Sequence, residues 1–322
     1  MTAPPAAPTG PGPEPARPTR PSAGPVPTAS SLRSGLLAGV TAYVLWGFFP
    51  LYFPLLEPAS ALEILAHRIV WSLVVSVLLV MATRGWAKVR AVLANRRQLG
   101  LLVAASVLIS VNWGTYIWAV NSNQVVETAL GYFINPLISV LMGVVLLRER
   151  MRPWQWAAFG VATLAVVVLT AAYGRLPWIA LVLAFSFGTY GLCKKLAGVE
   201  SVPSLAVETA VTFPLALGFL IYLQVQGTLV FGHSSLANTL LLFGCGIITV
   251  GPLLAFNAAA TRIPLSVLGL LQYLTPILQF ILGITVFAEH MPAERWVGFG
   301  IVWVALAIFT IDGIRNSPRS AG

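Results

Sequence analysis

Residues Gln124–Leu169 read QVVETALGYFINPLISVLMGVVLLRERMRPWQWAAFGVATLAVVVL, and a related stretch follows 140 residues later, where Pro264–Phe309 read PLSVLGLLQYLTPILQFILGITVFAEHMPAERWVGFGIVWVALAIF. No gap is needed to align them, and identical residues coincide: Pro136 with Pro276, Gly143 with Gly283, Glu149 with Glu289, Met151 with Met291, Trp156 with Trp296, Phe159 with Phe299 and Gly160 with Gly300. Such self-similarity indicates two related halves. Because both copies are apolar, an odd number of membrane spans in each half would invert one half relative to the other.

The composition predicts a membrane protein rather than a soluble globule. Of the 322 residues, 57% are hydrophobic and only 9% are charged, which leaves too little polar surface for a soluble domain. About 20 apolar residues cross the hydrocarbon of a bilayer. Ten segments qualify: Ser34–Phe53, Leu62–Ala82, Leu99–Val120, Glu127–Leu147, Trp154–Ala171, Pro177–Leu196, Pro203–Leu223, Ala237–Ala259, Leu265–Phe287 and Glu294–Ile314. We therefore expect an all-α membrane protein whose ten transmembrane helices form a five-plus-five inverted repeat.

The distribution of basic residues predicts the orientation. A cytoplasmic amino terminus places 16 of the 19 Lys and Arg residues in the cytoplasm, with Arg175 and Arg295 outside and Arg68 within a span. The repeated loops agree, since residues 148–152 are basic whereas their counterparts 288–292 are acidic. Both termini are therefore expected to be cytoplasmic.

The chain divides into four expected regions. Residues 1–33 carry ten prolines within the first 27 positions, which predicts a disordered, Pro-rich cytoplasmic tail without the apolar segment of a signal peptide. Residues 34–173 and 174–314 are the two expected five-helix repeats, and residues 315–322 form a short cytoplasmic tail.

Matching polar stripes mark two repeat-related spans. Residues spaced by three or four share one helix face. The first stripe consists of Thr128, Tyr132, Asn135, Ser139 and Gly143, and the second of Gln272, Thr275, Gln279 and Gly283. These faces would meet near mid-membrane, where inverted-repeat transporters bind substrate, although polar stripes also join helices by hydrogen bonds alone.

The predicted substrate cavity draws on both stripes and on amphipathic residues of other spans. Its candidate lining is Trp46, Asn112, Tyr116, Tyr132, Asn135, Ser139, Tyr190, Gln272, Thr275 and Gln279. Pro136 and Pro276 are hinge candidates, because a proline frees the carbonyl four residues before it.

Ionisable residues inside spans are costly unless they are paired or hydrated, and so suggest function. Glu63 and His67 share a helix face, and a carboxylate beside an imidazole could carry a proton. Arg68 is expected to pair with a carboxylate on another helix or to extend outward. At an offset of 141, His67 corresponds to Glu208, which would put one titratable group near each mouth. The alternative is that Glu63 and Arg68 are interfacial or form a structural ion pair. Glu127 is expected to cap its own helix.

Other classes of site lack the required residues. Cys193 and Cys245 lie in apolar runs without metal-ligand spacing, and neither HExxH nor GxxxxGK occurs. We expect no metal, no cofactor and no enzymatic centre. The net charge of +9 is spread over short loops, which argues against a nucleic-acid partner. The expected partners are a small-molecule substrate and the lipid bilayer, and glycine-rich faces leave a homodimer open.

Several motifs resemble those of a known family. They are Trp46-Gly47, Ala66–Ser72 (AHRIVWS), Asn112-Trp113, Ile117–Asn121 (IWAVN) and Glu127–Leu137 (ETALGYFINPL). From about Leu36 to about Asp312 the chain is similar to the RarD group of the EamA branch of the drug/metabolite transporter superfamily. The resemblance implies a ten-helix carrier in the bacterial plasma membrane. Pro54 stands where a lysine is expected in related members.

The combined prediction is a secondary transporter. We expect export of small amphipathic metabolites or drugs by alternating access, driven by a gradient and coupled to protons through Glu63, His67 or Glu208. The alternatives are a lipid flippase or scramblase and, as a separate class, a membrane-embedded enzyme acting on lipid.

Overall fold

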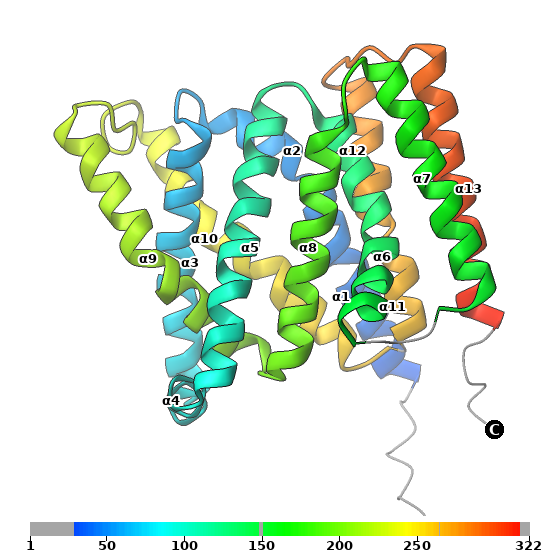
Figure 1. Cartoon of the computed structure of the whole chain (residues 1–322). Coiled ribbons are helices and arrows are strands. Elements are labelled where there is room, and N and C mark those ends of the chain that lie inside the picture. The colour runs from blue at the N-terminus through cyan, green and yellow to red at the C-terminus, as the bar shows by residue number, and fades with distance from the viewer. Residues whose placement is uncertain (1–28, 148–150, 264, 316–322) are drawn as a thin grey trace, which may run out of the picture.

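The computed structural model describes residues 29–147, 151–263 and 265–315, which form a bundle of helices without strands (Figure 1). Most of the predicted amino-terminal tail, almost all of the predicted carboxyl-terminal tail, and Glu149 with its two neighbouring arginines lie outside the described residues.

The described elements follow one another along the chain. They are α1 (Ala29–Gly47), α2 (Phe49–Tyr52), the 3-10 helix η1 (Phe53–Leu56), α3 (Ala61–Ala82), α4 (Trp86–Ala94), α5 (Arg96–Asn121), α6 (Val125–Leu147), α7 (Pro153–Tyr173), α8 (Trp178–Ala197), α9 (Ser201–Val225), α10 (Leu236–Ala260), α11 (Leu265–Leu271), α12 (Leu274–Thr285) and α13 (Ala293–Arg315).

The predicted ten-span, all-α architecture is confirmed. Among the described residues, nine stretches are long and apolar enough to cross a membrane, one of them made jointly by α11 and α12. The tenth span is bent by 45° where α1 gives way to α2 and η1. Pro50 lies in the first turn of α2, where its missing N–H leaves no helical hydrogen bond unmade.

Two differences from the predicted helices lie between the second and third spans. The nine-residue helix α4 was not predicted, and it is too short to cross a bilayer. The third span begins at Arg96 rather than Leu99, because the Asn95 side chain accepts hydrogen bonds from the backbone N–H groups of Arg97 and Gln98. Asparagine at this position stabilises a helix start.

The two repeats interlock. By the sequence offset, α1 corresponds to α8, α3 to α9, α5 to α10, α6 to α11 with α12, and α7 to α13. The first helix of each repeat packs mainly against the other repeat: α1 contacts α10 and α12, and α8 contacts α5 and α6. The pairs α3–α9, α6–α12 and α7–α13 also join a helix to its counterpart. This pairing is the two-fold arrangement expected of an inverted repeat.

The bundle has two distinct ends. We call the end at which α1 begins and α13 finishes the terminal end, and it lies at the bottom of Figure 1 with α4. The far end carries the links from η1 to α3 and from α9 to α10.

A buried apolar cluster fills the bundle toward the far end. This far-end cluster includes Phe49, Phe53, Leu56, Ala59, Ile64, Tyr116, Ile117, Val120, Val125, Ile179 and Leu242. Its members come from both repeats, so their burial joins the two repeats at this end.

Candidate functional site

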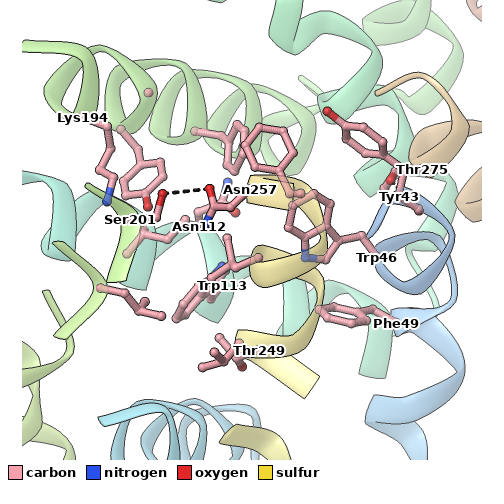
Figure 2. Close-up of a pocket in the computed structure, with 18 of the residues that line it drawn as sticks. Tyr43, Trp46, Phe49, Asn112, Trp113, Lys194, Ser201, Thr249, Asn257 and Thr275 are labelled. Atoms are coloured by element: carbon pink, nitrogen blue, oxygen red, sulfur yellow. Dashed lines mark hydrogen bonds between the residues drawn. The ribbon is translucent and has the colours of Figure 1, made fainter. Parts of the chain in front are cut away.

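A cavity of about 410 Å³ lies between the two repeats (Figure 2). Its lining includes buried residues inside helices, such as Arg68 and Thr249, and continues to Lys194, Ser201 and Asn257 at the terminal end. The far-end cluster lies between the cavity and the opposite side. The cavity therefore reaches one end of the bundle only.

Nine of the ten predicted lining residues lie on this cavity: Trp46, Asn112, Tyr116, Tyr132, Asn135, Tyr190, Gln272, Thr275 and Gln279. Ser139 does not; its side chain is exposed on α6, outside the cavity lining. The polar stripe of α6 winds slowly around the helix, because four-residue steps exceed the helical period of 3.6 residues. Ser139 has therefore turned away from the cavity.

Aromatic rings make up much of the wall. Tyr43 and Trp46 of α1 meet Phe256 of α10, with ring centroids 5.6 to 6.1 Å apart and edge-on or tilted. Tyr43, Phe49 and Phe256 also line this cavity and were not predicted from the sequence. Trp113, which neighbours the predicted Asn112, lines it as well. Such rings offer broad apolar faces to a flat solute.

Polar side chains of the wall hold the repeats together. The Asn112 amide donates to the Leu183 carbonyl and to Ser186 Oγ, both at 3.0 Å, which ties α5 to α8. Gln279 Nε2 donates to the Trp46 carbonyl at 3.2 Å and to the Tyr116 hydroxyl at 2.9 Å. Two acceptors, Asn135 Oδ1 and Gln279 Oε1, have no partner in the described structure although both are buried. Buried acceptors without a partner are uncommon in folded proteins, and a bound solute that donates hydrogen bonds would satisfy them.

Arg68 behaves differently from both predictions made for it. Its side chain neither pairs with a carboxylate in the described part of the chain nor extends outward; the residue is 4% exposed and lines the cavity. Nε donates to Thr249 Oγ1 at 2.8 Å, and the guanidinium carbon lies 4.1 Å from the centroid of the Trp113 ring. The Arg68 cation is therefore held beside the cavity by a hydroxyl and aromatic faces.

Glu63 and His67 lie beyond the cavity, at the far end. Glu63 Oε1 accepts the backbone N–H groups of Val230 and Phe231 at 2.9 and 3.2 Å. His67 Nε2 is 3.9 Å from that same oxygen, so the two side chains adjoin as their spacing predicts. The His67 ring packs on Phe231, with centroids 4.7 Å apart. This pair ties α3 to the α9–α10 link rather than lining the cavity.

Glu208 reaches the cavity near its terminal end. Its carboxylate accepts a hydrogen bond from Ser204 Oγ at 2.6 Å and forms an ion pair with Lys194, which also lines the cavity. Ser201 donates to Asn257 Oδ1 at 2.8 Å, the bond drawn in Figure 2. The repeat offset aligns His67 with Glu208, yet only Glu208 faces the cavity.

The two hinge candidates have different surroundings. Pro136 lies inside the continuous helix α6, whereas Pro276 lies in α12, just after the interruption at Gln272 and Tyr273 that separates α11 from α12. Only Pro276 lines the cavity. The carbonyl expected to be freed by Pro276, that of Gln272, lies at this interruption.

A second, more polar hollow of about 360 Å³ lies at the far end, lined in part by Glu127, Arg175, Glu289 and Arg295. Glu289 accepts the backbone N–H groups of Val125 and Val126 and so caps α6. Burial raises the pKa of Glu289 from 4.5 to about 7, while those backbone hydrogen bonds act in the opposite direction.

The prediction that Glu127 caps its own helix is wrong. Its carboxylate accepts the Ile179 backbone N–H at 3.1 Å and pairs with Arg175 at 2.8 Å, so it caps α8 instead. The start of α6 is capped instead by Glu289, a residue of the second repeat.

Comparisons with known proteins agree with this architecture. The profile of the EamA-like transporter family matches the chain twice, over residues 33–171 and 176–311. The chain is 54% identical to Protein RarD of Streptomyces exfoliatus over 89% of this chain and 91% of that protein. It is 43% identical to the uncharacterized transporter PA0485 of Pseudomonas aeruginosa, over 90% of this chain and 97% of the relative. A protein of known crystal structure shares the fold, with a TM-score of 0.56 and 20% identity over 88% of this chain and 99% of that one.

Proposed function

The chain belongs to the RarD group of the EamA-like transporter family, and from that premise we propose that it exports small amphipathic metabolites or drugs through the cavity between its repeats. Members of this family are multi-pass membrane transporters and not enzymes.

The observation that carries the proposal is a cavity that reaches only the terminal end. Its wall combines aromatic faces with amide groups, a composition suited to a solute that is partly apolar and partly polar. The far-end cluster closes the other side with residues from both repeats. Alternating access would follow if these far-end contacts parted while the terminal end closed around the solute.

The proposed direction depends on orientation. The positive-inside rule supports a cytoplasmic terminal end, because most Lys and Arg residues of the described part of the chain lie in segments at that end. The described conformation would then receive a solute from the cytoplasm. Release on the outer side makes the transporter an exporter.

For the energy source we propose exchange with protons at Glu208. Protonation of this carboxylate would break its ion pair with Lys194 on the cavity wall, and so link proton occupancy to the charge that a solute meets. Glu63 and His67 are the alternative proton carriers, although they lie outside the cavity. Glu208→Gln should abolish the response of transport to a pH gradient. If neutral substitutions of Glu208, Glu63 and His67, made one at a time, all leave that response intact, proton coupling through these residues is contradicted.

The test of transport uses the full-length chain in proteoliposomes, with radiolabelled aromatic amino acids and amphipathic drugs, with and without a pH gradient. Gly191 lines the cavity, and an added Cβ there would meet no atom within 4 Å. Gly191→Leu should therefore obstruct the cavity without crowding at the added Cβ, and should lower transport at least ten-fold.

Gly218→Leu is the matched control, because Gly218 is exposed on α9, outside the cavity lining, and an added Cβ there also meets no atom within 4 Å. Transport should survive this change. Equal transport by the native chain and Gly191→Leu would contradict a path through the cavity. Movement of labelled lipid with no movement of any solute would instead favour the flippase alternative.

A further inference from the structure

The charges on the cavity wall do not balance. Among the described residues, three charged side chains line the cavity: Arg68, Lys194 and Glu208. Lys194 and Glu208 form an ion pair with each other. Arg68 is therefore left as a buried cation whose charge is not neutralised within the described part of the chain.

The surroundings of Arg68 satisfy only part of its guanidinium. Trp113 lies against it at 4.1 Å, and the Phe49 and Phe53 ring centroids lie 5.4 and 5.7 Å from its central carbon. The planar group has five N–H donors directed around its edge, where ring faces do not accept them. Nε is bonded to Thr249, but Nη1 is buried without a partner in the described structure.

An unpartnered cation inside a membrane protein is costly, and it is usually paired or hydrated. Aromatic faces offset part of that cost. An anionic group entering the cavity would offset more, because a carboxylate neutralises the charge and also accepts a charge-assisted hydrogen bond. One unbalanced cation matches one negative charge, so a doubly charged phosphate would bring an excess of charge into a largely aromatic cavity.

We infer that the solute of this cavity is an aromatic monoanion, in which a carboxylate pairs with Arg68 and the ring lies against the aromatic wall. The inference rests on the proposed transport function and adds a substrate class to it. Asn135 Oδ1 and Gln279 Oε1, the unpartnered acceptors of the same cavity, would take hydrogen-bond donors of the solute. Arg68 is then a specificity-determining residue.

The test measures binding to the purified full-length protein by equilibrium dialysis. Two matched probe pairs are used, 3-phenylpropionate with 3-phenylpropionamide and indole-3-acetate with indole-3-acetamide. Within each pair the shape is retained and only the negative charge is lost. The native protein should bind each carboxylate at least ten-fold more tightly than its amide. Equal affinities within both pairs, or no saturable binding of either carboxylate, would overturn the inference.

Variants of Arg68 test whether this residue causes the preference for carboxylates over amides. Arg68→Met should reduce the carboxylate-to-amide ratio to about one, whereas Arg68→Lys should keep part of it because the cation remains. Arg262→Met is the control, since Arg262 is an exposed cation outside the cavity lining. An unchanged ratio in Arg68→Met would overturn the assignment. If Arg68→Met fails to fold, the ratio in the native protein and in Arg68→Lys still decides it.

Transport of the same probes in proteoliposomes separates the two proposals. Transport of aromatic amides with no preference for carboxylates would leave the export proposal standing and overturn the substrate class. Arg68-dependent binding of carboxylates without movement of any solute would support the substrate class and contradict export.

Discussion

The far end and the terminal end of the bundle are held by different kinds of contact. At the far end, Glu63, Glu127 and Glu289 each accept backbone N–H groups from a segment of the other repeat. Beside the cavity at the terminal end, the ion pair of Lys194 with Glu208 and the bond from Ser201 to Asn257 stay within the second repeat. The far-end bonds therefore have to break when the repeats part. The terminal-end contacts that also join the repeats, Lys88 with Glu200 and Arg152 with Asp312, are side-chain ion pairs with at least one exposed partner.

This difference indicates that closure of the far end depends on the exact position of a few backbone N–H groups. A carboxylate that accepts two backbone N–H groups needs the partner backbone in one position, because the backbone fixes the direction of both donors. Side-chain ion pairs tolerate more movement. The far end is thus the end at which small substitutions should have large effects.

The largest effect is expected at Gly283, where α12 meets the start of α6. An added Cβ would lie 2.6 Å from Val126 Cγ2 and 3.1 Å from the Val126 backbone nitrogen. Gly283→Leu should push the helices apart, lower transport at least ten-fold and cost about 1–3 kcal/mol of unfolding free energy. Transport assays and thermal unfolding measure both effects, with Gly218→Leu as control. Native-like closure and transport in Gly283→Leu would show that this contact is dispensable.

A smaller effect is expected from Glu63. Glu63→Ala leaves the Val230 and Phe231 N–H groups without their acceptor, which should cost about 1–3 kcal/mol. Glu63→Gln keeps an acceptor oxygen and should lose less. The terminal-end control is Glu200→Ala, which removes an ion pair with Lys88 whose side chains are 66% and 59% exposed. That change should cost less than about 1 kcal/mol in denaturant unfolding. A cost for Glu200→Ala equal to that for Glu63→Ala would remove the distinction between the two ends.

The last prediction concerns the pH dependence of stability at Glu289. Its folded-state pKa of about 7 exceeds its ordinary value of 4.5, so its contribution to stability is fully present below pH 4.5 and is lost as pH rises through 7. The melting temperature should therefore fall more between pH 5 and pH 8 in the native chain than in Glu289→Gln. Parallel pH profiles for the two proteins would mean that burial does not perturb this carboxyl.

Much of the fold follows from the sequence because the repeat and the apolar runs are long-range patterns. Polar lining residues such as Asn112 and Gln279 were also predictable, since a polar side chain on an apolar helix contrasts with its neighbours. Tyr43 and Phe256 give no such contrast. The amino-acid pattern also treats Pro136 and Pro276 alike, whereas α6 is continuous and the α11–α12 span is interrupted. Glu127 and Glu289 each cap a helix of the other repeat. Which helix each one caps depends on tertiary packing, which helix periodicity does not encode.

The central claim, that the repeats expose the cavity to one end at a time, can be tested by thiol accessibility. Cys193 and Cys245, which are buried and free, would be replaced by alanine. Single cysteines would then be placed at Leu253, on the cavity wall, and at Ala59, in the far-end cluster. An impermeant thiol reagent is applied to vesicles of either orientation, with and without solute.

Leu253→Cys should react only from the cytoplasmic side, and Ala59→Cys should react only from the outer side. A solute gradient that drives transport should lower the first reactivity as it raises the second. Reaction of both cysteines from the same side, or reactivities that do not change in opposite directions, would contradict alternating access through this cavity.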